Sequence, residues 1–165
     1  MREIATSIRN FRQVNSWLFR GGQPKDKEYE QLQAMGVRTI ISLRWNTQEI
    51  SKERALAEKL GFNFVSIPLS YWVLPTRKEI ARFFSIVDDE AMRPIFVHCL
   101  HGSDRTGMFS AMYRINYENW TADQAYREMK LAGFHKFTVY QFKWAVYGFA
   151  HRLERERRAK GRSSA

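Results

Sequence analysis

Three strand-like runs of β-branched and apolar residues, separated by helix-like stretches, constrain the fold of this chain most strongly. The runs span residues 37–43 (VRTIISL), 62–69 (FNFVSIPL) and 95–99 (IFVHC). Short runs of this composition are typical of strands that are buried on both faces. Residues 26–35 and 52–60 carry apolar residues at helical spacing, and each stretch is followed by a glycine, a common helix terminator. The alternation predicts an α/β domain with a central, mostly parallel sheet flanked by helices.

Further elements are predicted around this centre. Residues 16–20 (SWLFR) are expected to form a short edge strand. The patterns Thr-x-x-Glu at 76–79 and Thr-x-x-Gln at 121–124 are capping boxes, which predict that a helix starts at each. Residues 107–116 and 139–158 carry apolar side chains at helical spacing, so each is predicted to form a helix.

The size and charge of the chain limit its organisation and its partners. With 165 residues and 44% hydrophobic residues, it is expected to form one domain, residues 1–165, with a core at about 17–150. Residues 151–165 are rich in Lys and Arg and are interpreted as the solvated end of a helix with a frayed terminus. The net charge of +10 favours an anionic ligand such as a phosphate ester, a lipid head group or a nucleic acid. No nucleic-acid-binding motif is recognisable, so no nucleic-acid partner is expected.

Other features exclude several classes of protein. No run approaches the roughly 20 apolar residues of a membrane helix. The first residues lack the apolar core of a secretory signal, so a cytoplasmic location is expected. An exported or periplasmic location is the alternative if the chain is a trimmed precursor. The chain is expected to be a monomer. The single cysteine, Cys99, excludes an internal disulfide and a cysteine-cluster metal site.

That cysteine lies in the sequence HCLHGSDRTG, at the carboxyl end of the third run. Ligands of open α/β sheets bind beyond the carboxyl ends of the strands. A helix that starts at about Gly107 would offer free N–H groups to an anion, and residues 100–105 could curl into a nest of such groups. Arg105 adds a planar fork for two phosphate oxygens. The same positive field would favour the thiolate of Cys99, a nucleophile for phosphorus.

The segment HCLHGSDRTG resembles the phosphate-binding loop of the cysteine-dependent protein tyrosine phosphatases: His-Cys, five residues, Arg, Ser or Thr, and Gly. Residues 17–24 (WLFRGGQP), 36–44 (GVRTIISLR) and 120–134 (WTADQAYREMKLAGF) are similar to the compact bacterial dual-specificity-like phosphatases. The resemblance implies a central, mostly parallel sheet flanked by helices, and a reaction that needs no metal or other cofactor.

The resemblance also implies roles for individual residues. Cys99 would be the nucleophile, Arg105 would clamp the phosphate, and the Thr106 hydroxyl would stabilise the departing thiolate. His98 would order the loop. Backbone amides that bind phosphate would come from Leu100, His101, Gly102, Ser103 and Asp104.

The chain departs from the family pattern at the general acid. The family usually carries an aspartate on a loop that corresponds to residues 68–79, but that stretch has no Asp, and its one carboxylate, Glu79, belongs to a capping box. The acidic residues at 88–90 are expected at the wrong end of the sheet. Asp104 is the remaining candidate, since myotubularin-like lipid phosphatases also carry Asp before this Arg. Alternatively, Asp104 only bonds loop amides or a neighbouring base, or substrates with good leaving groups need no acid.

Several other side chains are candidates for the surroundings of the site. Tyr71 and Trp72 are expected to wall the pocket, with a core position as the alternative. Arg20 and Arg44 are expected to brace the structure, with a position at the edge of the active site as the alternative. Weaker candidates for the rim are His101, His135 and Lys136.

The function predicted from these observations is hydrolysis of a phosphate monoester through a cysteinyl-phosphate. A protein tyrosine or dual-specificity phosphatase is the leading interpretation, with an inositol phosphate or phosphoinositide phosphatase as the alternative. The expected partner is accordingly a phosphorylated protein or an inositol phosphate. A non-catalytic phosphate-recognition module is the alternative from another class, because the usual acid is absent.

Overall fold

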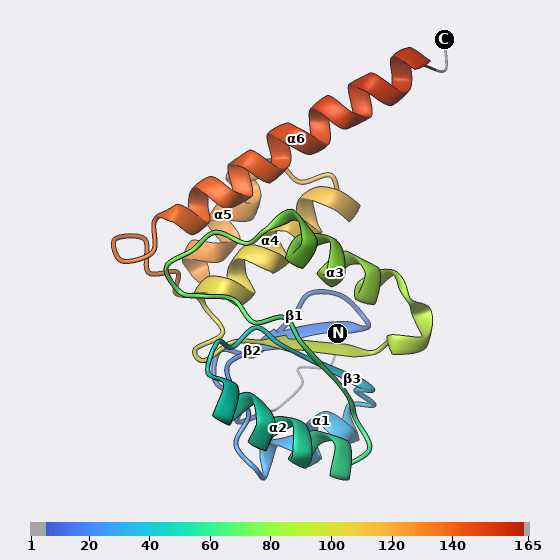
Figure 1. Cartoon of the computed structure of the whole chain (residues 1–165), viewed down its shortest axis with the longest axis vertical. Helices are drawn as coiled ribbons and strands as arrows, with labels where there is room; N and C mark the ends of the chain where they lie inside the picture. Colours follow the sequence, from blue (N-terminus) through green and yellow to red (C-terminus); the bar gives the residue numbers. More distant parts are fainter. Residues whose placement is uncertain (1–5, 164–165) are drawn as a thin grey trace.

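A five-stranded sheet in the order β1-β2-β5-β3-β4 runs through the middle of the molecule (Figure 1). The computed structural model describes residues 6–163, so residues 164 and 165 of the predicted frayed terminus lie outside the described part. Four strands run parallel: β2 (Leu18–Gly21), β5 (Ile95–His98), β3 (Thr39–Ser42) and β4 (Asn63–Ser66). The prediction of an α/β fold with a mostly parallel sheet is therefore confirmed.

The prediction that residues 16–20 form an edge strand is wrong. β2 lies inside the sheet, between β5 and the short antiparallel strand β1 (Arg12–Gln13). Arg12 pairs with Arg20 across this ladder. β1 consists of two polar residues without apolar alternation, so its strand conformation depends on pairing with β2 rather than on a local pattern.

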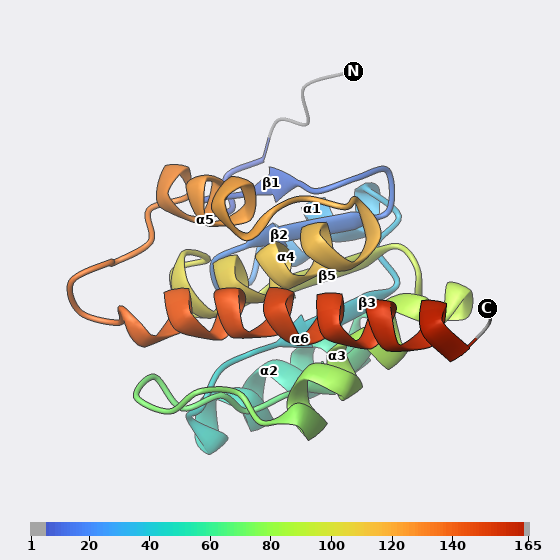
Figure 2. The same cartoon turned by 90° about the horizontal axis from the view of Figure 1, so that it is seen from above.

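Successive residues of the central strands point into two separate cores. Ile40 and Phe96 lie in one core, whereas Ile41 and Val97 lie in the other. This alternation follows from the strand geometry, in which neighbouring side chains face opposite sides of the sheet. Helices cover both faces (Figures 1 and 2), and the continuous apolar runs of the sequence reflect this two-sided burial.

Two helices lie on the first face and four on the second. α1 (Glu28–Ala34) and α2 (Thr47–Lys59) contribute residues such as Leu32 and Ile50 to the first core. The second face carries α3 (Arg77–Asp88), α4 (Asp104–Tyr117), α5 (Ala122–Leu131) and α6 (Gln141–Ser163). A 3₁₀ turn, η1 (Glu90–Met92), connects α3 to β5. No helix in residues 6–163 combines the length and the apolar character needed to cross a membrane.

Helix starts depend on side-chain caps. Both predicted capping boxes are present, and α3 begins where the Thr76 hydroxyl accepts from the Glu79 N–H at 3.3 Å while the Glu79 carboxylate accepts from the Thr76 N–H at 2.6 Å. α2 begins at Thr47, earlier than the predicted residue 52. Its start is explained by Asn46, whose side chain accepts from the N–H groups of residues 48 and 49.

α4 also begins earlier than predicted, at Asp104 instead of Gly107. The helix continues through Gly107, where a Cβ would meet Arg20 and Met129 only at ordinary contact distances of 3.5 Å. Residues 104–113 and 115 are buried, so α4 is covered on all sides rather than along the one predicted stripe. Its first turn consequently lies at the carboxyl edge of the sheet, only a short loop away from β5.

Candidate active site

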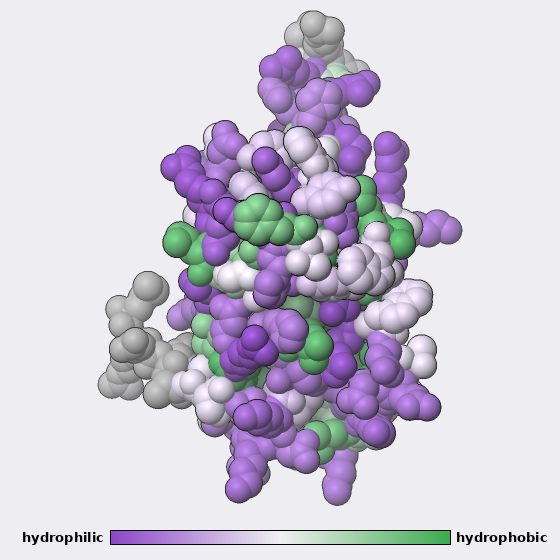
Figure 3. Space-filling view, turned by 90° about the vertical axis from the view of Figure 1, so that its left-hand side faces the viewer, coloured by the Kyte–Doolittle hydropathy of each residue, from purple (hydrophilic) through white to green (hydrophobic). Residues whose placement is uncertain are grey.

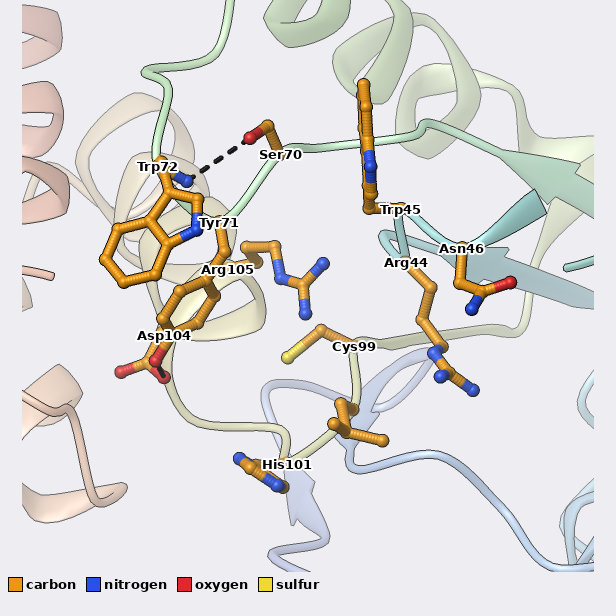
Figure 4. A pocket seen from close by; sticks show the side chains of 11 residues that line it. Arg44, Trp45, Asn46, Ser70, Tyr71, Trp72, Cys99, His101, Asp104 and Arg105 are labelled. Atoms are coloured by element: carbon orange, nitrogen blue, oxygen red, sulfur yellow. Dashed lines mark hydrogen bonds between the residues drawn. The ribbon is translucent and has the colours of Figure 1, made fainter. Parts of the chain in front are cut away.

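The connections that follow β3, β4 and β5 meet at the carboxyl edge of the sheet, on the left-hand side of Figure 1. They enclose a cavity of about 520 Å³ (Figure 4), lined by Arg44, Trp45, Asn46, Ser70, Tyr71, Trp72, Cys99, Leu100, His101, Asp104 and Arg105. Figure 3 shows this side of the molecule: hydrophilic residues cover most of it, and hydrophobic side chains form small separate groups. Parallel α/β sheets commonly bind ligands at this edge.

Cys99 is positioned by β5, which ends one residue before it. The Leu43 N–H of the neighbouring connection donates to the carbonyl of His98 at 2.8 Å and fixes this strand end. Cys99 is 2% exposed, and its sulfur points into the cavity, as does the guanidinium of Arg105 (Figure 4). The thiol and the cation therefore face the same space.

The loop turns sharply at Gly102. Its φ of +73° is in the left-handed region, and a Cβ there would lie 2.4 Å from the carbonyl carbon of Gly21. Both facts require glycine at this position. The buried Arg20 donates from Nη2 to the Gly102 carbonyl at 2.6 Å. Burial lowers the pKa of Arg20 to about 10, so the side chain remains a cation at neutral pH beneath the loop.

The backbone N–H groups of residues 100–106 make no hydrogen bond to other residues within 6–163. They comprise the loop and the first turn of α4, where helical N–H groups have no partner in the helix. Such groups, together with the positive end of the helix dipole, bind anions. The loop is thus suited to hold a phosphate group beside Cys99.

Arg105 is held in place by two strand ends. Its Nη1 donates to the carbonyls of Leu43 and Leu69, each at 3.1 Å. The guanidinium also lies 5.6 Å from the centre of the Tyr71 ring. Fixing the guanidinium before a ligand arrives lowers the entropy cost of binding phosphate oxygens.

Asp104 is almost fully buried and contacts three hydrogen-bonding groups. The Tyr71 hydroxyl donates to Oδ2 at 3.0 Å, and the backbone N–H of His135 donates to Oδ1 at 2.8 Å. Nδ1 of His135 lies 2.9 Å from Oδ2. Burial and the adjacent Asp104 carboxylate raise the pKa of Tyr71 to about 12, so its hydroxyl keeps its proton.

A second buried network lies behind the loop. His98 Nε2 is 2.7 Å from Oε1 of Glu53, which also accepts from the Tyr29 hydroxyl at 3.0 Å. Oε2 of Glu53 accepts from Ser42 at 3.2 Å. Burial alone would raise the pKa of Glu53, but His98 and the hydrogen bonds of Gln23 and Tyr29 outweigh burial and lower it. The network fixes the residue before Cys99.

Aromatic side chains form the outer walls of the cavity. Tyr71 packs edge-to-face against Trp72 and Phe142. Trp72 and Trp45 are 70% and 62% exposed and stand on opposite sides of the cavity in Figure 4. Tyr71 and Trp72 thus line the pocket, as predicted.

The structure brings together most of the residues that the sequence singled out. Cys99, Leu100, His101, Asp104 and Arg105 line the cavity. The rest of the predicted phosphate loop, Gly102, Ser103 and Thr106, lies behind them and does not line it. Thr106 is fully buried, and its hydroxyl has no partner within residues 6–163.

Some contributions were missed. Arg20 braces the loop as expected, but Arg44 lines the cavity, so for Arg44 the alternative position at the edge of the site applies. Trp45 and Asn46 follow β3, and the rule that ligands bind beyond strand ends could have found them. The contact of His135 with Asp104 joins residues 31 positions apart and has no local signal.

The usual acid is missing in the structure as well. Glu79 serves the cap of α3, and the acidic residues after that helix lie elsewhere: Asp88 accepts from Tyr117 at the far end of α4, and Asp89 caps η1. Within residues 6–163, no three His, Cys, Asp or Glu side chains are grouped so as to hold a metal ion.

Comparison with known proteins agrees with this geometry. Residues 5–145 match the model of a family described as DSP-PTPase phosphatase fused to NAD+ kinase. The dual specificity protein phosphatase TpbA of Pseudomonas aeruginosa is 28% identical over 125 residues, which are 76% of this chain and 55% of that protein. The chain thus spans about half the length of this curated relative.

Solved structures show the same fold. The crystal structure of P. aeruginosa TpbA has a TM-score of 0.72 at 23% identity and covers 88% of this chain and 91% of that one. The core catalytic domain of the PP-IP phosphatase SIW14 from S. cerevisiae, in complex with citrate, has a TM-score of 0.75 at 18% identity and covers 96% of both chains.

Proposed function

The chain belongs to the family of DSP-PTPase phosphatases fused to NAD+ kinase, and on this premise we propose that it hydrolyses phosphate monoesters through a cysteinyl-phosphate intermediate. The observation that carries the proposal is that Cys99 and Arg105 line the same cavity, next to a loop whose backbone N–H groups, residues 100–106, have no hydrogen-bond partner within residues 6–163. In our proposal the chain is a single phosphatase domain, residues 1–165, with a core of about residues 17–150, and residues 151–165 extend it as a basic helical tail.

In the proposed reaction, Cys99 attacks phosphorus while the loop amides and Arg105 hold the equatorial oxygens. Water then attacks the cysteinyl-phosphate and regenerates the thiolate. Asp104 takes part in the transfer of a proton to the leaving oxygen. The proposal further treats the chain as a monomer in the cytoplasm, where a reducing environment keeps the Cys99 thiol free.

The proposed substrates are phosphorylated proteins with phosphotyrosine, phosphoserine or phosphothreonine. The aromatic walls Tyr71 and Trp72 support a substrate with an apolar ring next to the phosphate. An inositol phosphate or phosphoinositide is the second candidate. The net charge of +10 and the Asp-Arg-Thr sequence favour it, whereas the absence of lysine from the loop does not.

Turnover of para-nitrophenyl phosphate tests the proposal. The wild type should hydrolyse it in the presence of a chelator, and vanadate should inhibit. The variant Cys99→Ser should lose turnover but keep its thermal stability and its binding of vanadate. Wild-type protein that binds vanadate without turnover would indicate a phosphate-recognition module instead. A panel of phosphopeptides and inositol phosphates then separates the two substrate classes by kcat/KM.

A further inference from the structure

We propose that His135 is the proton donor for the leaving group, with the Asp104 carboxylate as the residue that positions it. This inference rests on the proposed phosphatase function. It assigns the acid step to an Asp104–His135 pair, which takes the place of the aspartate that residues 68–79 lack.

The geometry of the pair carries the argument. His135 lies on the connection between α5 and α6, and its backbone N–H donates to Oδ1 of Asp104 at 2.8 Å. Its Nδ1 lies 2.9 Å from Oδ2. The Asp104 side chain is 3% exposed, whereas that of His135 is 50% exposed. With Nδ1 held by the carboxylate, Nε2 is the nitrogen left for other contacts, and it makes no hydrogen bond to residues 6–163.

Neighbouring groups hold both oxygens of the Asp104 side chain. The His135 backbone N–H donates to Oδ1, and the Tyr71 hydroxyl is placed to donate to Oδ2. Oδ2 of Asp104 also contacts Nδ1 of the His135 ring at 2.9 Å. Asp104 therefore fixes the orientation of the ring, as a carboxylate does for the histidine of a catalytic triad.

The reaction balances with His135 in this role. As Cys99 forms the bond to phosphorus, the bond from phosphorus to the leaving oxygen breaks, and its electron pair takes the proton from Nε2 of His135. In the second step, neutral Nε2 accepts a proton from the attacking water, and the electron pair of the phosphorus–sulfur bond returns to Cys99. In-line attack places the leaving oxygen opposite Cys99, and Asp104, which contacts His135, forms part of the cavity lining.

The other charged groups near His135 are few. The ring of His101 lies at 6.2 Å between centroids, and Lys136 is the next residue and lies over Phe137. Burial, followed by Arg9 and His135, lowers the pKa of His101, which disfavours its charged form. Arg105 is a further cation that lowers the pKa of His101. Of the two histidines, only His135 has a carboxylate in contact with its ring, so it is the one held as a proton donor.

The test measures how kcat depends on the leaving group for the wild type, His135→Gln and Asp104→Asn. In His135→Gln the acid is lost, whereas the Gln amide can still donate to Asp104. We expect kcat for phenyl phosphate to fall about 100- to 1,000-fold, within the range of general acid catalysis. For 2,4-dinitrophenyl phosphate, whose leaving group needs no proton, kcat should fall less than about ten-fold. The basic limb of the kcat–pH profile should disappear in His135→Gln and persist in Asp104→Asn. His151→Gln, on the exposed face of α6, is the matched control and should behave as the wild type.

Two results would overturn the inference, and they differ from each other. If His135→Gln keeps the wild-type leaving-group dependence and basic limb while Asp104→Asn loses both, Asp104 is the acid and the phosphatase function stands. If the wild type hydrolyses no phosphate monoester at all, the proposed function fails and the acid assignment fails with it. Vanadate binding and thermal unfolding of each variant show that the phosphate loop is intact, so loss of folding is not mistaken for loss of the acid.

Discussion

Replacing Gly102 by alanine is expected to damage both stability and activity, because this glycine is constrained in two independent ways. Its φ is +73°, a conformation that costs a residue with a Cβ about 1 kcal/mol. In addition, the new Cβ would lie 2.4 Å from the carbonyl carbon of Gly21 and 2.5 Å from the nitrogen of Gly22. To reach an ordinary contact of 3.4 Å, the loop and the end of β2 must separate by about 1 Å.

That separation breaks two hydrogen bonds across the gap. The bond from Arg20 to the Gly102 carbonyl, 2.6 Å long, involves a charged donor, and its loss costs about 2 kcal/mol. The bond from the Gln23 N–H to the Leu100 carbonyl, 3.2 Å long, adds about 1 kcal/mol. Together with the backbone strain, the expected loss of unfolding free energy is about 4 kcal/mol, a large share of the stability of an average domain.

Gly36→Ala provides the matched control. Gly36 has nearly the same φ, +76°, but nothing lies within 4 Å of a Cβ built there. Calorimetry should show a fall in Tm of about 3 °C for Gly36→Ala and about 12 °C for Gly102→Ala. A displacement of about 1 Å near reacting groups should also lower kcat/KM about 100-fold in Gly102→Ala only. Equal losses of Tm in the two variants would refute the steric part of the reasoning.

Two further predictions concern buried charges. Arg20→Met removes the donor of the buried Gly102 carbonyl but also removes a buried cation with two unpaired nitrogens, so Tm should fall by less than about 6 °C, while kcat/KM falls about ten-fold; a fall in Tm as large as that of Gly102→Ala at unchanged kcat/KM would contradict this. The folded-state pKa of Glu53 is lowered, so its stabilising effect is full above the unfolded value of about 4.3 and is lost as pH falls through the folded one. Urea unfolding between about pH 5 and pH 3 should therefore lose less stability in Glu53→Gln than in the wild type, and equal pH slopes would count against the role of the His98–Glu53 pair.

Elements with a strong local pattern could be predicted from the sequence. β3 and β5 are apolar runs buried on both faces, and α3 and α5 begin at capping boxes that are complete within four residues. Elements that depend on partners elsewhere in the chain could not. The two residues of β1 form a strand only by pairing with β2. The start of α4 was predicted at Gly107 because glycine commonly marks a helix boundary, but this glycine lies inside the helix and packs against Arg20 and Met129.

The same difference between local and distant contacts applies to the candidate site. Cys99 and Arg105 belong to one continuous motif, so their spacing alone predicted their chemistry. The surroundings of Asp104 are assembled from Tyr71 and His135, which are 33 and 31 positions away. Residues so far apart in the sequence form no helical or strand pattern together, so the partners of this buried carboxylate can be identified only from the three-dimensional structure.

The exposed side chains around the cavity and beside Asp104 stand on connections, whereas the loop that carries Cys99 joins two buried elements, β5 and α4. Trp45 follows β3, Trp72 lies between β4 and α3, and His135 lies between α5 and α6. Insertions, deletions and exchanges in such surface segments leave the sheet and α4 untouched. Grafting of these three segments between homologues is therefore a direct route to enzymes with altered substrate preference, because selection can act on the rim while the scaffold continues to fold.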